Sequence, residues 1–505
     1  MTAPRRRGGD LRLNKRQHGQ VLIWFLGFGA TLAVVFTGVY SVGQITSEKQ
    51  KIVNAADAAA YSGALTEARA LNLVSYTNRA VIANETLVAQ MVSLDSWTSY
   101  FAKATDVYQK EINALATAVT TIPVVNVIVK GLALGLKALN IAAKPLAQGV
   151  DQLTPALIFG WERVFALWYT ATIKSAFTPP FMAQAAEAAA QNVLTQNVAQ
   201  QDGRNDTAPR MLQVVGFGIR NQLEWGDLTK YYSKSAAGGP NDNRRYAEQL
   251  LLASLDKFSV SRTGSNVPVL DTLFGNSSFC LPFVVKFGSE KLGPTRLVNY
   301  ERWEAQDTVE FKIATPPAGV LGCGWGKAKG VPQGWGRASA STRGTVMNTS
   351  AGAGARAFSE NHNNRGWTGV KQLYDVTRDA NGKPTATEVT FAVAAAKPSA
   401  AIRSNETLGY ANRPMTGPTG SPDLKAGFAA DQISALAEAT VYFERPVRSN
   451  NDRTAGTLFR ADGFTEFASL YNPYWQVRLS SPSAVTRGLA YGAAGINPLL
   501  SVFAP

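Results

Sequence analysis

Strongly apolar residues fill one uninterrupted window near the start of the chain. Residues 21–42 are almost entirely apolar, and no charged residue occurs between Gln20 and Ser47. A helix of this length spans about 33 Å, enough to cross the hydrocarbon core of a bilayer. A cleaved secretory signal is the alternative, but its apolar region is usually about 7–15 residues long and ends in a small-residue cleavage site. The pattern therefore predicts an uncleaved transmembrane helix at residues 21–43.

A helical pattern continues beyond this segment. No proline occurs between Pro4 and Pro123, and Ala, Leu, Glu, Gln and Lys, which are among the best helix formers, are frequent. Apolar residues such as Leu71, Val74 and Val81 recur at approximately helical spacing. The pattern predicts one long helix, or two nearly collinear helices, emerging from the membrane.

Small residues are concentrated at positions 55–64, where eight of the ten residues are Ala, Gly or Ser. A face of small side chains lets helices approach closely. We therefore predict a helix-packing face made of Ala55, Ala56, Ala59, Ala60, Gly63 and Ala64. The alternative is a good helix-forming stretch without a packing partner.

The segment 121–149 is almost wholly apolar except for Lys130, Lys137 and Lys144. Seven residues are nearly two helical turns, so these lysines form one stripe along a helix. A second transmembrane span is the alternative, but a central lysine costs about 2.5–3.5 kcal/mol on insertion scales. The sequence therefore favours an amphipathic helix that packs on the long helix or lies on the membrane surface.

From about residue 206 the pattern changes, because Gly, Pro, Asn and Ser become more frequent and apolar and polar residues alternate. Strands are predicted at 309–313, 389–393, 439–443 and 474–479, and an amphipathic helix at 242–258. The residues at 379–383 resemble a hairpin turn, which predicts that 373–377 pairs with the strand at 389–393.

The expected fold class is α+β. We expect a basic cytoplasmic tail at 1–20, a transmembrane helix at 21–43, a helical extracytoplasmic region at 44–205 and a β-rich extracytoplasmic domain at 206–505. The first three would form an anchor and a long helical arm. The last would be a mostly antiparallel sheet structure with long loops.

Charge sets the expected orientation in the membrane. The chain has a formal net charge of +14, and residues 1–20 contribute six basic residues against Asp10, hence 6 − 1 = +5. The flank after the apolar window has fewer basic residues, so the N-terminus should stay in the cytoplasm and the body should lie outside it. The remaining +9 is diffuse and does not form a nucleic-acid patch.

Residues that carry chemistry are scarce. The chain has two His and two Cys, which argues against a histidine-rich metal cage, a zinc ribbon or a disulfide-dense scaffold. We also find no phosphate-binding loop of the GxxxxGK[ST] type. Cys280 and Cys323 are disulfide candidates if both are exported, with two unrelated thiols as the alternative. We expect no enzymatic activity, cofactor, metal or small-molecule substrate.

A Gly- and Trp-rich segment at 322–336 is the main candidate for a partner-binding loop. It contains six Gly together with Trp325 and Trp335. Exposed Trp side chains beside Gly could contact a ligand or partner. The alternative is that both rings fold back onto the sheet.

The N-terminal residues resemble a known family. The sequence Arg16-Gln17-His18-Gly19-Gln20, the apolar span and the run Asn54-Ala55-Ala56-Asp57-Ala58-Ala59-Ala60 are similar to the N-terminal module of TadE/TadG-like (Tad/Flp tight-adherence) pilus-assembly proteins. Residues 468–479 also resemble a closing segment of such envelope proteins. The resemblance implies an inner-membrane, pseudopilin-like protein. The chain departs from true pilins at Trp24, the fifth residue after Gly19, where pilins place a Glu.

Our leading hypothesis is a single-pass envelope protein of the bacterial inner membrane that assembles or anchors a Tad/Flp-type pilus or a related secretion system. Its expected partners are inner-membrane lipid and other pilus or secretion-system subunits. The alternative is a membrane-anchored surface-binding protein or adhesin that uses the loop at 322–336. A membrane-tethered hydrolase, a third class, would depend on His362 or on a pair of acidic residues.

Overall fold

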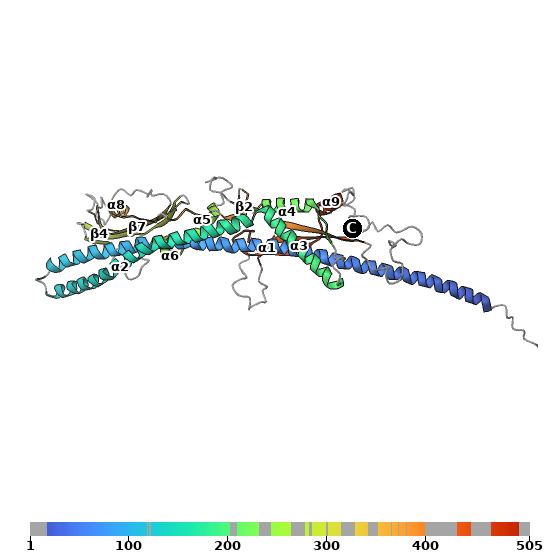
Figure 1. The fold of residues 1–505 in the computed structure, drawn as a ribbon. Coiled ribbons are helices and arrows are strands. Elements are labelled where there is room, and N and C mark those ends of the chain that lie inside the picture. Colours follow the sequence, from blue (N-terminus) through green and yellow to red (C-terminus); the bar gives the residue numbers. More distant parts are fainter. Residues whose placement is uncertain are drawn as a thin grey trace, which may run out of the picture.

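The structure is a computed structural model of the chain. It describes residues 18–118, 120, 123–202, 210–231, 244–263, 278–281, 285–298, 301–314, 329–341, 352–364, 366–371, 373–379, 381–398, 432–445 and 466–493. One helix, α1, runs through almost the whole length of the molecule, and the sheets lie along one side of it (Figure 1).

Helix α1 (His18–Ala118) contains 101 residues without a break. At 1.5 Å per residue it is about 150 Å long. Its continuity follows from the lack of proline and the abundance of good helix formers. The prediction of a long helix that continues from the apolar window is confirmed. The N-terminal end of α1 projects beyond the other labelled elements (Figure 1).

Two further helices pack on α1. Helix α2 (Pro123–Trp168) folds back along it and continues into a short π-helix, η1 (Tyr169–Lys174). Helix α3 (Pro179–Asp202) then packs against α1. Lys144 of α2 lies 2.9 Å from Asp106 of α1, whereas Lys130 and Lys137 are exposed. Residues 123–149 of the predicted segment are therefore part of a helix that packs on α1.

The first sheet contains four antiparallel strands in the order β1-β10-β11-β12. Their bounds are β1 (Arg210–Met211), β10 (Glu388–Pro398), β11 (Gln432–Phe443) and β12 (Trp475–Ser480). Side chains of β10 alternate between two clusters. Val393 belongs to the cluster that contains α1, whereas Ala394 packs with Phe217 of α4 (Val215–Leu228) and Ala490 of α9 (Ala484–Ala493). The first sheet thus lies between α1 on one face and helices α4 and α9 on the other.

The second sheet lies farther along α1, toward its C-terminal end (Figure 1). Its strand order is β3-β4-β6-β7-β8, with β5 paired to β6. The bounds are β3 (Ser278–Leu281), β4 (Val285–Leu292), β5 (Thr295–Val298), β6 (Arg302–Ala314), β7 (Lys329–Ser341) and β8 (His362–Asn364). All of these pairs are antiparallel except β7 with β8. Helix α8 (Gly352–Ser359) packs on β6 and β7.

The remaining described elements connect the two sheets. They are β2 (Thr229–Tyr231), which pairs with β9 (Tyr374–Val376), and helices α5 (Arg244–Ser254) and α6 (Lys257–Val260).

The α+β class is confirmed, and strands β6, β10, β11 and β12 lie at or overlap the four predicted strand positions. Two local predictions are wrong. Short antiparallel pairing does form across the predicted turn, where Arg378 bridges to Pro384 and the Thr385 N–H donates to the Thr377 carbonyl, but 373–377 does not pair with β10. Its strand β9 pairs with β2, which is more than a hundred residues earlier in the chain. Residues 329–336, predicted as part of a loop, form the first half of β7 and pair with β6.

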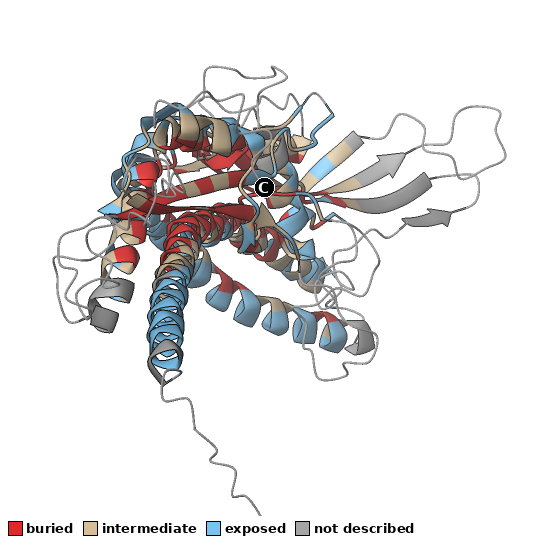
Figure 2. Cartoon of the chain, turned by 90° about the vertical axis from the view of Figure 1, so that its right-hand side faces the viewer, coloured by how far each residue is buried: buried red, intermediate tan, exposed pale blue. Residues whose placement is uncertain are grey.

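A single hydrophobic cluster joins the helical half of the chain to the β-rich half. It contains Ile52 and Leu71 of α1 together with Val393 and Val441 of the first sheet. Figure 2 shows α1 changing from exposed at its N-terminal end to buried beneath the sheet. The core therefore extends across the predicted domain boundary near residue 206.

Candidate functional site

The N-terminal part of α1 is an exposed apolar helix. The 18-residue window that marks it as a candidate membrane span is 0% buried, and its largest side chains, Trp24 and Phe25, are 81% and 77% exposed. Surfaces of this size and apolarity are not stable in water, so they mark contact with membrane or protein. Among the described residues, α2 is the second helix long and apolar enough to cross a membrane.

An ion-pair junction marks the point where α1 enters the folded body. Lys397 of β10 lies 2.7 Å from Glu48, and Lys51 lies 2.9 Å from the same carboxylate. Lys49 donates a hydrogen bond to the backbone carbonyl of Ser434 in β11. Burial raises the pKa of Glu48, but the two lysines outweigh this and the pKa is lowered. The junction therefore ties the first sheet to α1 directly after the exposed segment.

The predicted small-residue face follows this junction and is covered within the chain. Ala55, Ala56, Ala59, Ala60 and Ala64 are at most 4% exposed and belong to the cluster shared with the first sheet. A Cβ atom on Gly63 would lie 2.2 Å from the Phe391 ring of β10. The close approach that small residues permit is thus used between α1 and other parts of the same chain, so the face presents no free surface to another subunit here.

Most of the other predicted site residues lie outside the described part of the structure. Cys280 lies in β3, but its side chain is outside the described part, as are Cys323 and Trp325. Their disulfide and binding roles stay predictions. Trp335 lies in β7, half-buried between Lys103, 5.7 Å from the ring centroid, and Arg356, 4.8 Å from it.

A row of buried polar side chains on α1 was missed by the sequence analysis. Asn78 donates hydrogen bonds to the backbone carbonyls of Tyr374 (2.8 Å) and Leu470 (2.7 Å). Two glutamates in the same row accept hydrogen bonds, Glu67 from Asn221 (2.8 Å) and Glu85 from Trp367 (2.8 Å). These positions are 11 and 7 residues apart, which is close to whole helical turns. In the sequence, the recurrence of polar residues at that spacing is the signal that could have revealed this buried row.

Burial raises the pKa of both glutamates in this row to about 8. The second carboxyl oxygen of each, Oε2 of Glu67 and Oε1 of Glu85, is buried and has no hydrogen-bond partner among the described residues. An ionised carboxylate is costly in such surroundings, so both groups are protonated at neutral pH.

We expect the stability of the body to decrease as the pH rises from about 4.5 to about 8. The unfolded chain ionises these glutamates near the ordinary pKa of 4.5, whereas the folded chain holds the protons up to about 8. Glu67→Gln should therefore stabilise the protein at pH 8, by on the order of 3 kcal/mol, and much less at pH 4.5. Thermal unfolding of the purified protein at both pH values measures this. An equal effect of Glu67→Gln at both would contradict it, and Glu388→Gln, at an exposed site, is the control.

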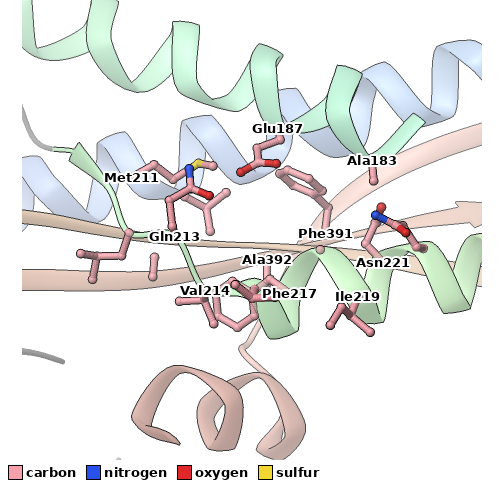
Figure 3. A pocket seen from close by; sticks show the side chains of 16 residues that line it. Ala183, Glu187, Met211, Gln213, Val214, Phe217, Ile219, Asn221, Phe391 and Ala392 are labelled. Carbon is pink, nitrogen blue, oxygen red and sulfur yellow. The ribbon is translucent and has the colours of Figure 1, made fainter. Parts of the chain in front are cut away.

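A cavity of about 270 Å³ adjoins the contact between Gly63 and Phe391. Figure 3 shows its lining: Glu187 of α3, Met211 of β1, Asn221 of α4 and Phe391 of β10 surround it. The lining combines apolar side chains with few polar groups. It has no pair of reactive groups that would indicate catalysis.

The outer face of α2 is also strongly apolar. Its exposed large side chains, each at least 38% accessible, are Val127, Ile128, Leu132, Leu134, Leu139, Ile141, Leu146, Leu153, Leu157, Phe159, Trp161, Val164 and Trp168. The inner face, with Val129, Ala143 and Ile158, is buried. Helix α2 thus packs one side inside the chain and leaves a second, largely apolar side uncovered.

These features define a class of protein: a body built around a single helix whose exposed apolar end is a candidate membrane anchor. Residues 19–68 match the family model of putative Flp pilus-assembly TadE/G-like proteins. The match covers about a tenth of the chain, and it contains the exposed apolar helix, the Glu48 junction and the small-residue face. No curated protein and no solved structure matches the chain.

Proposed function

We propose that this protein is a single-pass, pseudopilin-like protein of the bacterial inner membrane that acts in assembling or anchoring a Tad/Flp-type pilus or a related secretion system. The role is structural, without catalysis. The observation that carries the proposal is the match of residues 19–68 to the pilus-assembly family, because the matched residues include the exposed apolar end of α1.

The continuous helix suggests how such a role would work. No break separates the anchor from the segment that carries both sheets. The part of α1 beyond residue 43 is 75 residues long and spans about 110 Å. The position and tilt of the anchor are therefore transmitted to the body without a flexible linker.

The charge distribution supports the proposed orientation. Six basic residues precede the apolar segment. After the segment, the acidic Glu48 offsets the positive charge of Lys51 and Lys397. The positive-inside bias then leaves the N-terminus in the cytoplasm and the body in the periplasm or outside the cell. Lipid would contact residues 21–43, and other pilus subunits would meet the exposed apolar surfaces of α1 and α2.

Disrupting the anchor tests this function. We expect Leu32→Arg combined with Val35→Arg to remove the protein from the membrane fraction and to abolish pili, because each arginine costs about 2.5–3.5 kcal/mol at the centre of a spanning helix. Both side chains are exposed and lie in a segment that is 0% buried, so the fold should persist. Membrane fractionation and electron microscopy of pili are the measurements.

A matched control places the same changes outside the membrane. Leu252→Arg with Val260→Arg replaces an exposed leucine and an exposed valine of α5 and α6. This variant should remain in the membrane and support pili. Normal piliation in cells that carry the anchor variant would reject the proposed function, provided that the variant is absent from the membrane fraction.

A further inference from the structure

Two aspartates and a histidine from three distant elements meet beside the hairpin of α1 and α2. The Nδ1 atom of His362 in β8 lies 2.9 Å from Oδ1 of Asp95 in α1 and 3.0 Å from Oδ1 of Asp151 in α2. One ligand atom from each residue lies within 4.8 Å of the others. Because 267 residues separate Asp95 from His362, only the tertiary fold brings this group together.

Burial distinguishes this group from an ordinary surface cluster. The side chain of Asp95 is 0% exposed, and its Oδ2 atom is buried without a hydrogen bond of ordinary geometry among the described residues, although the Asn364 amide lies close enough to act on the carboxyl. A buried carboxylate oxygen without a partner requires an explanation, such as a bound ion. The side chains of His362 and Asp151 are 34% and 46% exposed, so an ion can reach the group from solvent.

The charges around the group are unbalanced. The electrostatic partners that act on His362 are carboxylates, those of Asp95, Asp151 and Glu360. Glu360 has its own cation, Lys103, at 2.7 Å. With a neutral imidazole the two aspartates leave two negative charges, and a protonated imidazole cancels one of them. A divalent cation cancels both.

We propose that Asp95, Asp151 and His362 bind one divalent transition-metal ion of the Zn²⁺ type. An imidazole nitrogen with two carboxylate oxygens is a donor set suited to Zn²⁺, and it is less suited to Mg²⁺ or Ca²⁺, which prefer oxygen ligands alone. Water would supply the remaining coordination. The ion would join α1, α2 and β8 at one point and so hold the hairpin against the second sheet. This site is independent of the proposed function in pilus assembly.

Zinc titration of the full-length protein tests the site. The protein is purified in detergent without a histidine tag, treated with EDTA and titrated with ZnCl₂ by isothermal calorimetry. We expect one equivalent of Zn²⁺ to bind with micromolar or tighter affinity and to raise the thermal unfolding midpoint. Asp151→Asn and His362→Gln should each weaken binding at least tenfold.

His18→Gln is the matched control, because His18 and His362 are the two histidines of the chain. It should bind Zn²⁺ as the unaltered protein does. Asp151 is nearly half exposed, so Asp151→Asn should fold, and circular dichroism verifies this. Absence of Zn²⁺ binding, or binding that His362→Gln and Asp151→Asn leave unchanged, would overturn the proposal. A thermal midpoint that His362→Gln lowers but that Zn²⁺ does not raise would identify the group as an ion pair alone.

Discussion

Asp307→Ala is expected to lower the free energy of unfolding by about 3–5 kcal/mol, because it leaves a buried arginine without its counter-ion. Asp307 of β6 and Arg262, just after α6, are both 0% exposed. Nε of Arg262 lies 2.9 Å from Oδ1 of Asp307, and Nη2 lies 2.9 Å from Oδ2. This two-point pairing fixes both side chains in one geometry.

The same ion pair connects helix α1 to the second sheet. Ser96 of α1 donates a hydrogen bond to Oδ2 of Asp307 at 2.7 Å. Arg262 also donates through Nη1 to the Phe258 carbonyl (2.8 Å) and to Thr295 in β5 (3.0 Å). Removing the aspartate carboxylate therefore breaks the contact of β6 with α1 and its pairing with Arg262, the side chain that also binds β5.

Denaturant unfolding of the purified protein, followed by near-ultraviolet circular dichroism, measures this loss. Glu388→Ala is the control, because it removes an ion pair with Arg478 whose side chains are 47% and 54% exposed. Exposed pairs contribute at most about 1 kcal/mol. A loss for Asp307→Ala no larger than that of Glu388→Ala would show that the buried pair does not hold the second sheet in place.

Gly336→Ala is expected to force α1 and β7 apart. A Cβ atom at this position would lie 2.1 Å from the backbone oxygen of Ser96 and 2.4 Å from the backbone nitrogen of Tyr100. Backbone atoms of a long helix cannot rotate away as a side chain can. The cost should therefore reach or exceed the upper end of the about 1–3 kcal/mol that is typical of overpacking.

Hydrogen exchange of β7 and the thermal unfolding midpoint report this separation. Gly226→Ala in α4 is the control, because a Cβ atom there meets nothing within 4 Å. Since alanine is the better helix former, that variant should be neutral or stabilised by about 0.5–1 kcal/mol. Unchanged protection of β7 in Gly336→Ala would show that the strand and helix tolerate the extra atom.

Local patterns predicted many of the elements. The apolar window and the absence of proline were sufficient for α1, because helix formation depends on neighbours within a few residues. Alternation was sufficient for β10, where Phe391 and Val393 face one side and Ala392 and Ala394 the other. Which strands pair with each other was harder to predict from the sequence. The residues of β9 have strand character, but the turn at 379–383 gave no indication that β9 pairs with β2.

The sequence predicted only part of the packing role of the small residues. Their enrichment at Ala55–Ala64 predicted close packing, and the structure shows that the covering partner belongs to the same chain. Gly336 was assigned to a loop because glycine is frequent in loops. In the structure it lies in a strand, at a point where the backbone of β7 lies directly against the backbone of α1. Composition reports the size of a side chain but not which backbone lies opposite it.

The sequence by itself determined the long helix α1, its apolar N-terminal segment and the α+β class, since each depends on local periodicity and on transfer of apolar groups from water. The tertiary structure alone decided which polar residues of α1 are buried, which cation faces Asp307, and that Asp95, Asp151 and His362 meet. These contacts join residues that are tens to hundreds of positions apart. They depend on how rigid helices and sheets dock, which no window of neighbouring residues encodes.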